Sequence, residues 1–123
     1  MVTASITNHR QSPRKVRLVA SLIKGKTVAE ALDMLSVTTK RASDPLAKLI
    51  RSAVANAKNL GVPTESLYVQ ECTVNQGMTL KRFMPGARGS AFPIHKKSSH
   101  VKLVLGTKSV ALKAPKTPKA PKK

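Results

Sequence analysis

Residues 78–99 read MTLKRFMPGARGSAFPIHKKSS, and this stretch decides which fold the chain adopts. Its chain-breaking residues, Pro85, Gly86, Gly89 and Pro93, gather near the centre, and segments that can form β-strands flank them. A centre of this kind between two such segments predicts a long β-hairpin with an irregular tip. Each strand of about nine residues, at ~3.3 Å per residue, would extend roughly 30 Å.

The same stretch is basic and contains no acidic residue. Its cations are Lys81, Arg82, Arg88, Lys96 and Lys97. Because a two-stranded ribbon buries little of its own surface, we expect the hairpin to be mobile on its own. One interpretation is a flexible surface loop, and the other is an arm that becomes ordered by lying along RNA.

The whole chain shares this excess of positive charge. Its 123 residues include 23 Lys and Arg against 5 Asp and Glu, which gives a net charge of +18. Residues 72–123 hold 12 basic and no acidic residues, whereas residues 1–71 hold 11 basic and all 5 acidic ones. Cations in an acid-free half of a chain lack carboxylate partners there, so phosphate is the expected counter-charge.

Composition also excludes several classes of protein. Cys72 is the single cysteine, which rules out a disulfide framework and a cysteine-based zinc site. No apolar run approaches the roughly 20 residues that cross a bilayer, and residues 1–12 lack the apolar stretch of a signal peptide. We therefore expect an intracellular protein with a polyanionic partner and without a metal or cofactor.

Two short helices are predicted in the first third of the chain. The first has Ser12 as its N-cap and Pro13 as its first residue, and it ends before Gly25. The second opens with Thr27 and Glu30, which have the spacing of a capping box.

A third, longer helix is predicted to begin near residues 43–45, where a polar cap precedes a proline, and to end at Gly61. Its apolar residues recur at helical spacing. They are Leu46, Leu49, Ile50, Ala53, Val54, Ala57 and Leu60. We expect this stripe to face the core.

Strand patterns follow Pro63. Strict alternation over residues 67–74 predicts one face with Leu67, Val69, Glu71 and Thr73. The opposite face would then carry Tyr68, Gln70, Cys72 and Val74. A second strand is predicted over residues 101–105 and a third over residues 2–6.

These elements predict an α+β fold in which three helices pack on a small antiparallel sheet and a long β-hairpin protrudes. Residues 1–106 form one domain, with a body of residues 1–79 and 99–106 and a hairpin of about residues 78–99. Residues 107–123, rich in Lys, Ala and Pro, are predicted to be a disordered tail.

Three separate motifs carry a resemblance to a known family. They are SPRKVRLVA at 12–20 with IKGK at 23–26, SAVANA at 52–57, and LKRFMP at 80–85 with ARG at 87–89 and KKSSHV at 96–101. Taken together, and in this order over residues 2–106, they resemble bacterial large-subunit ribosomal protein twenty-two. The tail lies beyond the usual end of that family.

The resemblance implies a scaffold and assembly protein of the large ribosomal subunit, in the cytoplasm, without catalytic activity. Its implied partners are 23S-type ribosomal RNA, neighbouring large-subunit proteins and the nascent polypeptide, with no membrane and no small-molecule substrate. The hairpin tip is implied to line the nascent-peptide exit tunnel. The tip residues are Met84, Pro85, Gly86, Ala87, Arg88, Gly89, Ser90, Ala91 and Phe92. Gly86 and Ser90 stand where the family usually has basic residues.

Ten side chains are our candidates for binding ribosomal RNA, because folded RNA presents phosphates and shape more than readable base edges. They are Arg10, Arg14, Lys15, Arg17, Lys81, Arg82, Arg88, Lys96, Lys97 and His100. A packed or exposed His100 is an open alternative. Phe92 either stacks on a base or packs against the opposite strand of the hairpin.

Two other functions are alternatives to this one. An enzyme would need paired carboxylates or a supported histidine, and the five acidic residues are scattered or are used as helix caps. A DNA-compacting protein fits the Lys/Ala/Pro tail and would bind duplex DNA with little sequence preference. The sequence contains no helix-turn-helix pattern, and a long basic hairpin exceeds what groove binding needs.

Overall fold

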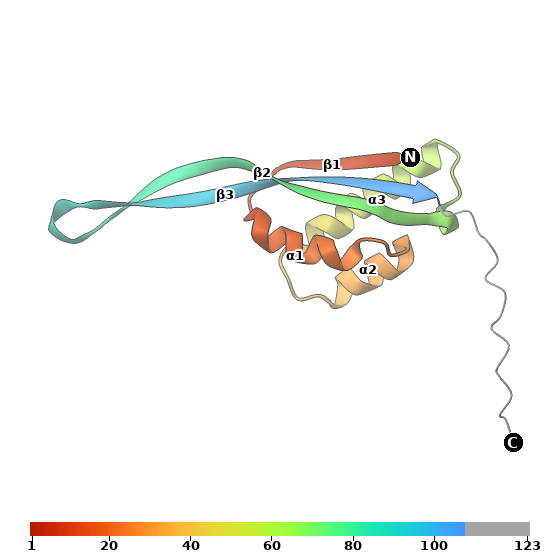
Figure 1. The fold of residues 1–123 in the computed structure, drawn as a ribbon, viewed down its shortest axis with the longest axis horizontal. Coiled ribbons are helices and arrows are strands. Elements are labelled where there is room, and N and C mark those ends of the chain that lie inside the picture. Colours follow the sequence, from red (N-terminus) through yellow and green to blue (C-terminus); the bar gives the residue numbers. More distant parts are fainter. Residues whose placement is uncertain (108–123) are drawn as a thin grey trace, which may run out of the picture.

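The computed structural model describes residues 1–107 and contains three helices and one antiparallel sheet (Figure 1). The elements in chain order are β1 (Val2–His9), α1 (Pro13–Ile23), α2 (Val28–Val37), α3 (Ser43–Asn59), a 3-10 turn (Thr64–Ser66), β2 (Leu67–Pro85), a second 3-10 turn (Ala87–Gly89) and β3 (Ala91–Thr107). This confirms the predicted α+β fold with its long hairpin. The predicted disorder of residues 107–123 lies outside the described residues, except that Thr107 ends β3.

The sheet has the order β1-β3-β2, so β3 is its central strand. The β2–β3 ladder begins at the pair Leu67–Thr107 and continues to Pro85–Ala91. β1 pairs with the body part of β3, from Val2–Leu105 to His9–Ser99. Beyond that point β2 and β3 continue as a two-stranded ribbon, which projects to the left in Figure 1. We call residues 78–99 the arm.

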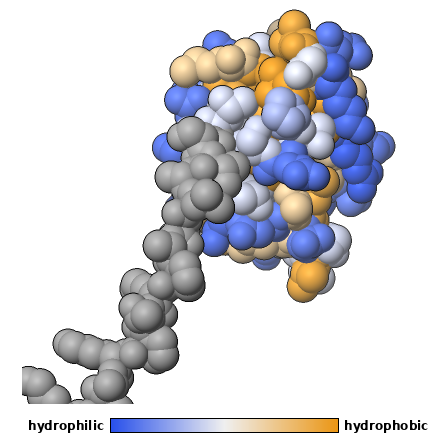
Figure 2. Space-filling model, turned by 90° about the vertical axis from the view of Figure 1, so that its right-hand side faces the viewer, coloured by the Kyte–Doolittle hydropathy of each residue, from blue (hydrophilic) through white to orange (hydrophobic). Residues whose placement is uncertain are grey.

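The core lies between one face of the sheet and the helices. Along β3, Val101, Leu103 and Leu105 are buried and alternate with the exposed Lys102 and the half-buried Val104. α1 packs against β2, and α3 packs against β1. Seen from the end opposite the arm, the body shows hydrophilic side chains beside separate hydrophobic patches (Figure 2).

The helix boundaries follow local chemistry in part. The capping box of α2 is formed: Glu30 N donates to Thr27 Oγ1 at 3.4 Å, and Thr27 N donates to Glu30 Oε2 at 3.2 Å. Ser12 occupies the N-cap of α1, but its side chain makes no capping hydrogen bond. α3 begins at Ser43 itself, and Ser43 Oγ donates to Thr38 O at 3.0 Å instead of capping the helix.

Two predictions about side-chain direction were wrong. In β2, Val69 pairs with Leu105 but Glu71 pairs with Val104, so Gln70 is an extra residue in a β-bulge. The bulge reverses the alternation, and Cys72 joins the core side with Val69.

The second error concerns the end of α3. Leu60 was predicted to be on the buried stripe, yet it is 67% exposed. It follows the last helical residue, and the chain turns at Gly61, whose φ is +70°. Its side chain therefore no longer follows the helical stripe.

The arm is paired along its length and closes at a compact tip. The ladder runs from Thr79–Lys97 to Pro85–Ala91, and Gly86 N donates to Ser90 O at 2.7 Å across the turn. The Phe92 ring lies so close to Gly86 that a Cβ there would collide with it. Phe92 therefore packs against the opposite strand of the hairpin, which is one of the two interpretations given for it above. The mobility of the isolated arm stays a prediction.

Ile50 and Leu60 provide a matched pair for testing where α3 meets the core. Ile50 is fully buried, so Ile50→Ala should lower the free energy of unfolding by about 2–5 kcal/mol. Leu60→Ala removes an exposed side chain and should change it by less than about 0.5 kcal/mol. Urea unfolding followed by circular dichroism measures both values, and equal effects would contradict this placement of α3.

Burial raises the pKa of the Cys72 thiol from 9.0 to about 11. Near about pH 8 the folded protein should therefore react much more slowly with a disulfide reagent than the urea-unfolded chain, because the thiolate is the nucleophile. Between pH 9 and 11 the unfolded thiol ionises first, so this residue should lower stability as pH rises. Below pH 9 both states keep the proton and the contribution is constant. Equal reaction rates for folded and unfolded protein would refute the burial of this thiol.

Candidate nucleic-acid interface

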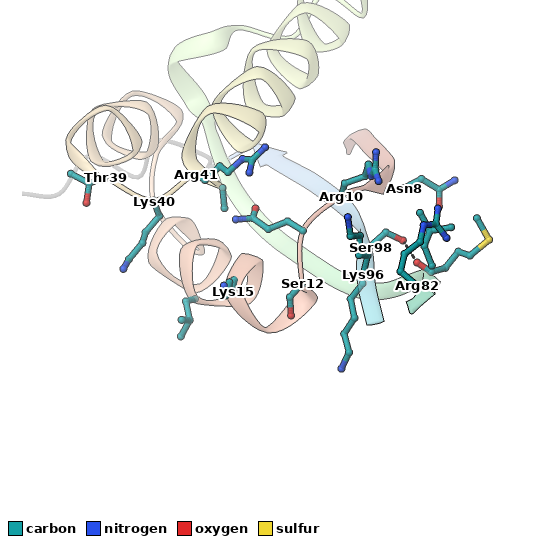
Figure 3. A pocket seen from close by; sticks show the side chains of 16 residues that line it. Asn8, Arg10, Ser12, Lys15, Thr39, Lys40, Arg41, Arg82, Lys96 and Ser98 are labelled. Carbon is teal, nitrogen blue, oxygen red and sulfur yellow. Dashed lines mark hydrogen bonds between the residues drawn. The ribbon is translucent and has the colours of Figure 1, made fainter. Parts of the chain in front are cut away.

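A groove of about 1340 Å³ lies where the arm leaves the body. Figure 3 shows its lining from four parts of the chain: the end of β1 with the β1–α1 connection, α1, the α2–α3 connection and the base of the arm. Seven of its side chains are cationic. They are Arg10, Lys15, Lys40, Arg41, Arg82, Lys96 and Lys97. Of the described residues that line this groove, none is acidic.

The fold brings these cations together although they are far apart in sequence. Arg10 follows the end of β1, and Lys15 lies in the first turn of α1, so the short β1–α1 connection separates them. Arg41 extends from the α2–α3 connection toward the side of the groove where Arg10 lies (Figure 3). Lys96 and Arg82 enter from the arm.

The groove contains half of the ten candidate RNA-binding residues. They are Arg10, Lys15, Arg82, Lys96 and Lys97. Arg14 is exposed on α1 outside the groove lining, and Arg88 is exposed at the tip of the arm. Arg88 adopts a left-handed backbone conformation with φ +57° and ψ +36°, which a non-glycine residue rarely adopts.

Three of the ten candidates make hydrogen bonds within the fold. Arg82 Nη1 donates to the neighbouring Lys81 O at 2.8 Å. Arg17 Nε donates to Val74 O at 3.0 Å, which satisfies a carbonyl of β2. His100 Nδ1 accepts a hydrogen bond from Asn8 N at 3.1 Å. Because Nδ1 accepts this bond, Nε2 is the ring nitrogen that is left to donate to a partner. RNA binding by all ten residues stays a prediction.

Sequence reasoning missed Lys40 and Arg41. Their only signal was the presence of two adjacent cations between predicted helices. The pattern did not reveal that the α2–α3 connection returns to the start of α1, because that placement depends on how the helices pack.

The register of the arm divides its side chains between two faces. Successive cross-strand pairs point to opposite faces of the ribbon. One face carries the pairs Leu80–Lys96 and Arg82–Ile94, and the other carries the pair Lys81–His95. Cations near the base therefore project from both faces of the ribbon.

The outer part of the arm has a different character from its base. Phe83 is 73% exposed and Phe92 is 54% exposed, and Met84 lies opposite Phe92. From residue 83 to residue 94, Arg88 is the single charged side chain. The arm is thus basic near the body and apolar toward its end.

Other chemistry has little support in the described residues. Within residues 1–107, no three His, Cys, Asp or Glu side chains gather as a metal site would require. No helix in that range is long and apolar enough to span a membrane. The raised pKa of Cys72 keeps its thiol protonated near neutral pH, which makes it a poor nucleophile. What these residues do gather in one place, in the groove, is positive charge.

Comparison with known proteins agrees with this picture. Residues 4–106 match the family described as ribosomal protein L22p/L17e. A protein of Lactobacillus delbrueckii subsp. bulgaricus named "Large ribosomal subunit protein uL22" is 56% identical over 97 residues, which cover 78% of this chain and 83% of that protein. Proteins of the same name from Lactobacillus helveticus and Anaeromyxobacter sp. strain K are 52% identical over 101 residues and 50% identical over 106 residues. These matches cover 81% and 85% of this chain, and 86% and 73% of those proteins.

The family match spans both the helical body and the arm, including every residue of the basic groove. The chain therefore belongs to the ribosomal protein L22p/L17e family.

Proposed function

We propose that this chain is a structural component of the large ribosomal subunit that binds and organises the large-subunit rRNA. The observation that carries the proposal is the groove at the base of the arm, in which seven cations gather from four parts of the chain. The seven cations repel one another unless an anion binds between them. Phosphate is the anion that RNA presents most densely.

The groove supplies the two kinds of cation that phosphate recognition uses. Arg10, Arg41 and Arg82 can each donate two parallel hydrogen bonds to a phosphate group and can stack on bases. The lysines act as compact point charges that tolerate different phosphate positions. This combination suits a folded RNA that is recognised by shape.

The arm is proposed to run between rRNA segments, because cations project from both faces of its base. Its tip is proposed to line the nascent-peptide exit tunnel, as the family resemblance implies. Small residues at the turn support this part of the proposal, because their side chains would take up little of the width of the tunnel. These residues are Gly86, Ala87, Gly89, Ser90 and Ala91. The partners are then rRNA, neighbouring large-subunit proteins and the growing polypeptide, all within the cytoplasmic ribosome.

Cell fractionation tests the location and the kind of nucleic acid. The tagged chain should sediment with large subunits, and large-subunit rRNA should co-purify with it. The association should survive a high-salt wash, because the arm is enclosed by RNA as well as attracted to it. Recovery with DNA, and absence from the subunit peak, would instead favour a DNA-compacting protein.

A shortened arm tests the role of the tip. Replacing residues 83–93 by Asn-Gly would close the hairpin at the pair Arg82–Ile94 with a two-residue turn. The removed segment contributes no buried residue to the core, so the melting temperature should change by less than about 5 °C.

Subunits assembled with the shortened chain should keep the protein but show altered chemical probing of rRNA at the tunnel wall. An unfolded variant would show that the outer arm belongs to the core. Unchanged probing of the tunnel wall would refute the proposed position of the tip.

A further inference from the structure

We propose that the groove at the base of the arm holds one unpaired strand of RNA, bracketed between body and arm, and does not hold a duplex. This inference rests on the proposed rRNA binding and adds the class of RNA that this site selects. The body wall of the groove consists of Arg10, Lys15, Lys40 and Arg41. The arm wall consists of Arg82, Lys96 and Lys97.

The placement of charge on two walls favours a single strand. An A-form duplex is convex and carries its phosphates on the outside, so it meets protein cations from one side at a time. A single strand that enters a re-entrant groove has phosphates and sugars accessible from both sides. At about 1340 Å³ the groove also exceeds the roughly 300–1,000 Å³ of a small-molecule site, which favours a segment of polymer over one nucleotide.

The groove also offers contacts that an unpaired strand uses more fully than a duplex. Polar side chains line it between the cations, among them Asn8, Ser12 and Thr39. They can bond 2′-hydroxyls, which both forms of RNA present, and Watson–Crick base edges, which only an unpaired strand exposes. Leu18 and Met78, each 65% exposed, also belong to the lining and offer apolar surface to unstacked bases. In a duplex the base faces are buried by stacking and cannot reach such side chains.

The two walls meet where the arm leaves the body. β1 and β2 each carry one extra residue in a bulge here. Thr7 and Asn8, the latter with φ +54°, lie opposite His100, and Gly77 and Met78 lie opposite Ser98. Asn8, Met78 and Ser98 line the groove as well. A strand that binds both walls would therefore span this junction and fix the angle between arm and body.

Binding of matched oligonucleotides to the full chain tests the inference. The probes are one RNA oligonucleotide as a single strand and the same sequence annealed to its complement. Two variants with equal loss of charge are compared: R10Q/K40Q/R41Q removes three exposed cations of the body wall, and K24Q/K26Q/K58Q removes three exposed cations outside the groove lining.

The unmodified chain should bind the single strand more tightly than the duplex. The body-wall variant should weaken single-strand binding by about tenfold, and its slope of log K against log salt should fall by about 2, because about 0.7 counterion is released per phosphate contact. The control variant should change single-strand binding by less than about threefold. Thermal melting checks that both variants remain folded, as expected for substitutions at exposed positions.

Duplex binding as tight as single-strand binding would overturn the inference. Equal losses for the two variants would also overturn it, because the charge would then act without regard to position. Either result would leave the proposed function standing if the chain still sediments with large subunits. Loss of that sedimentation would instead defeat the proposed function itself.

Discussion

The β2–β3 ladder is the interaction on which the rest of the structure depends. β2 has 19 residues and β3 has 17, and they remain paired from the far end of the body to the tip of the arm. Leu103 and Leu105 of β3 are fully buried, and burial of such a side chain contributes about 1.5–3 kcal/mol. The same strand then carries Lys96 and Lys97 into the groove. The core therefore fixes the position of residues that make no contribution to it.

The positive charge of the arm opposes this strand pairing. On the arm, Lys81 and Arg82 face a strand that carries Lys96 and Lys97, and the stretch between them contains no acidic residue. Like charges on neighbouring strands weaken a ladder, and a two-stranded ribbon has little burial to offset the cost. An anionic partner removes this repulsion, because it neutralises the cations on both faces of the arm. We therefore expect polyanion binding to increase order in the arm, while the body is stabilised by its own core.

The sequence predicted those features that local chemistry determines. The capping box at Thr27 and Glu30 and the turn around Gly86–Gly89 depend on neighbouring residues, and both were placed correctly. The bulge at Gln70 left no local signal, because residues 67–74 are compatible with an unbroken strand, and the pairing with β3 decides where the extra residue lies. Family motifs at residues 12–26, 52–57 and 80–101 predicted a ribosomal protein and not an enzyme, and the family match confirms both. Lys40 and Arg41 show what motifs leave out, since their neighbours in space come from other parts of the chain.

The groove itself arises because the sheet narrows from three strands to two. β1 follows β3 as far as the pair His9–Ser99, and the chain then turns through Arg10 into α1. At the same level Ser98 Oγ donates to Met78 O at 2.6 Å, and a Cβ on Gly77 would lie 2.6 Å from that hydroxyl oxygen. A side chain at position 77 would thus displace the Ser98 hydroxyl, which bonds the two strands of the arm where they leave the body. Departure of β1 opens the space, and the absence of a side chain at Gly77 leaves room for this bond beside it. The re-entrant shape and the clustering of cations therefore have one structural cause, the end of β1 at this junction.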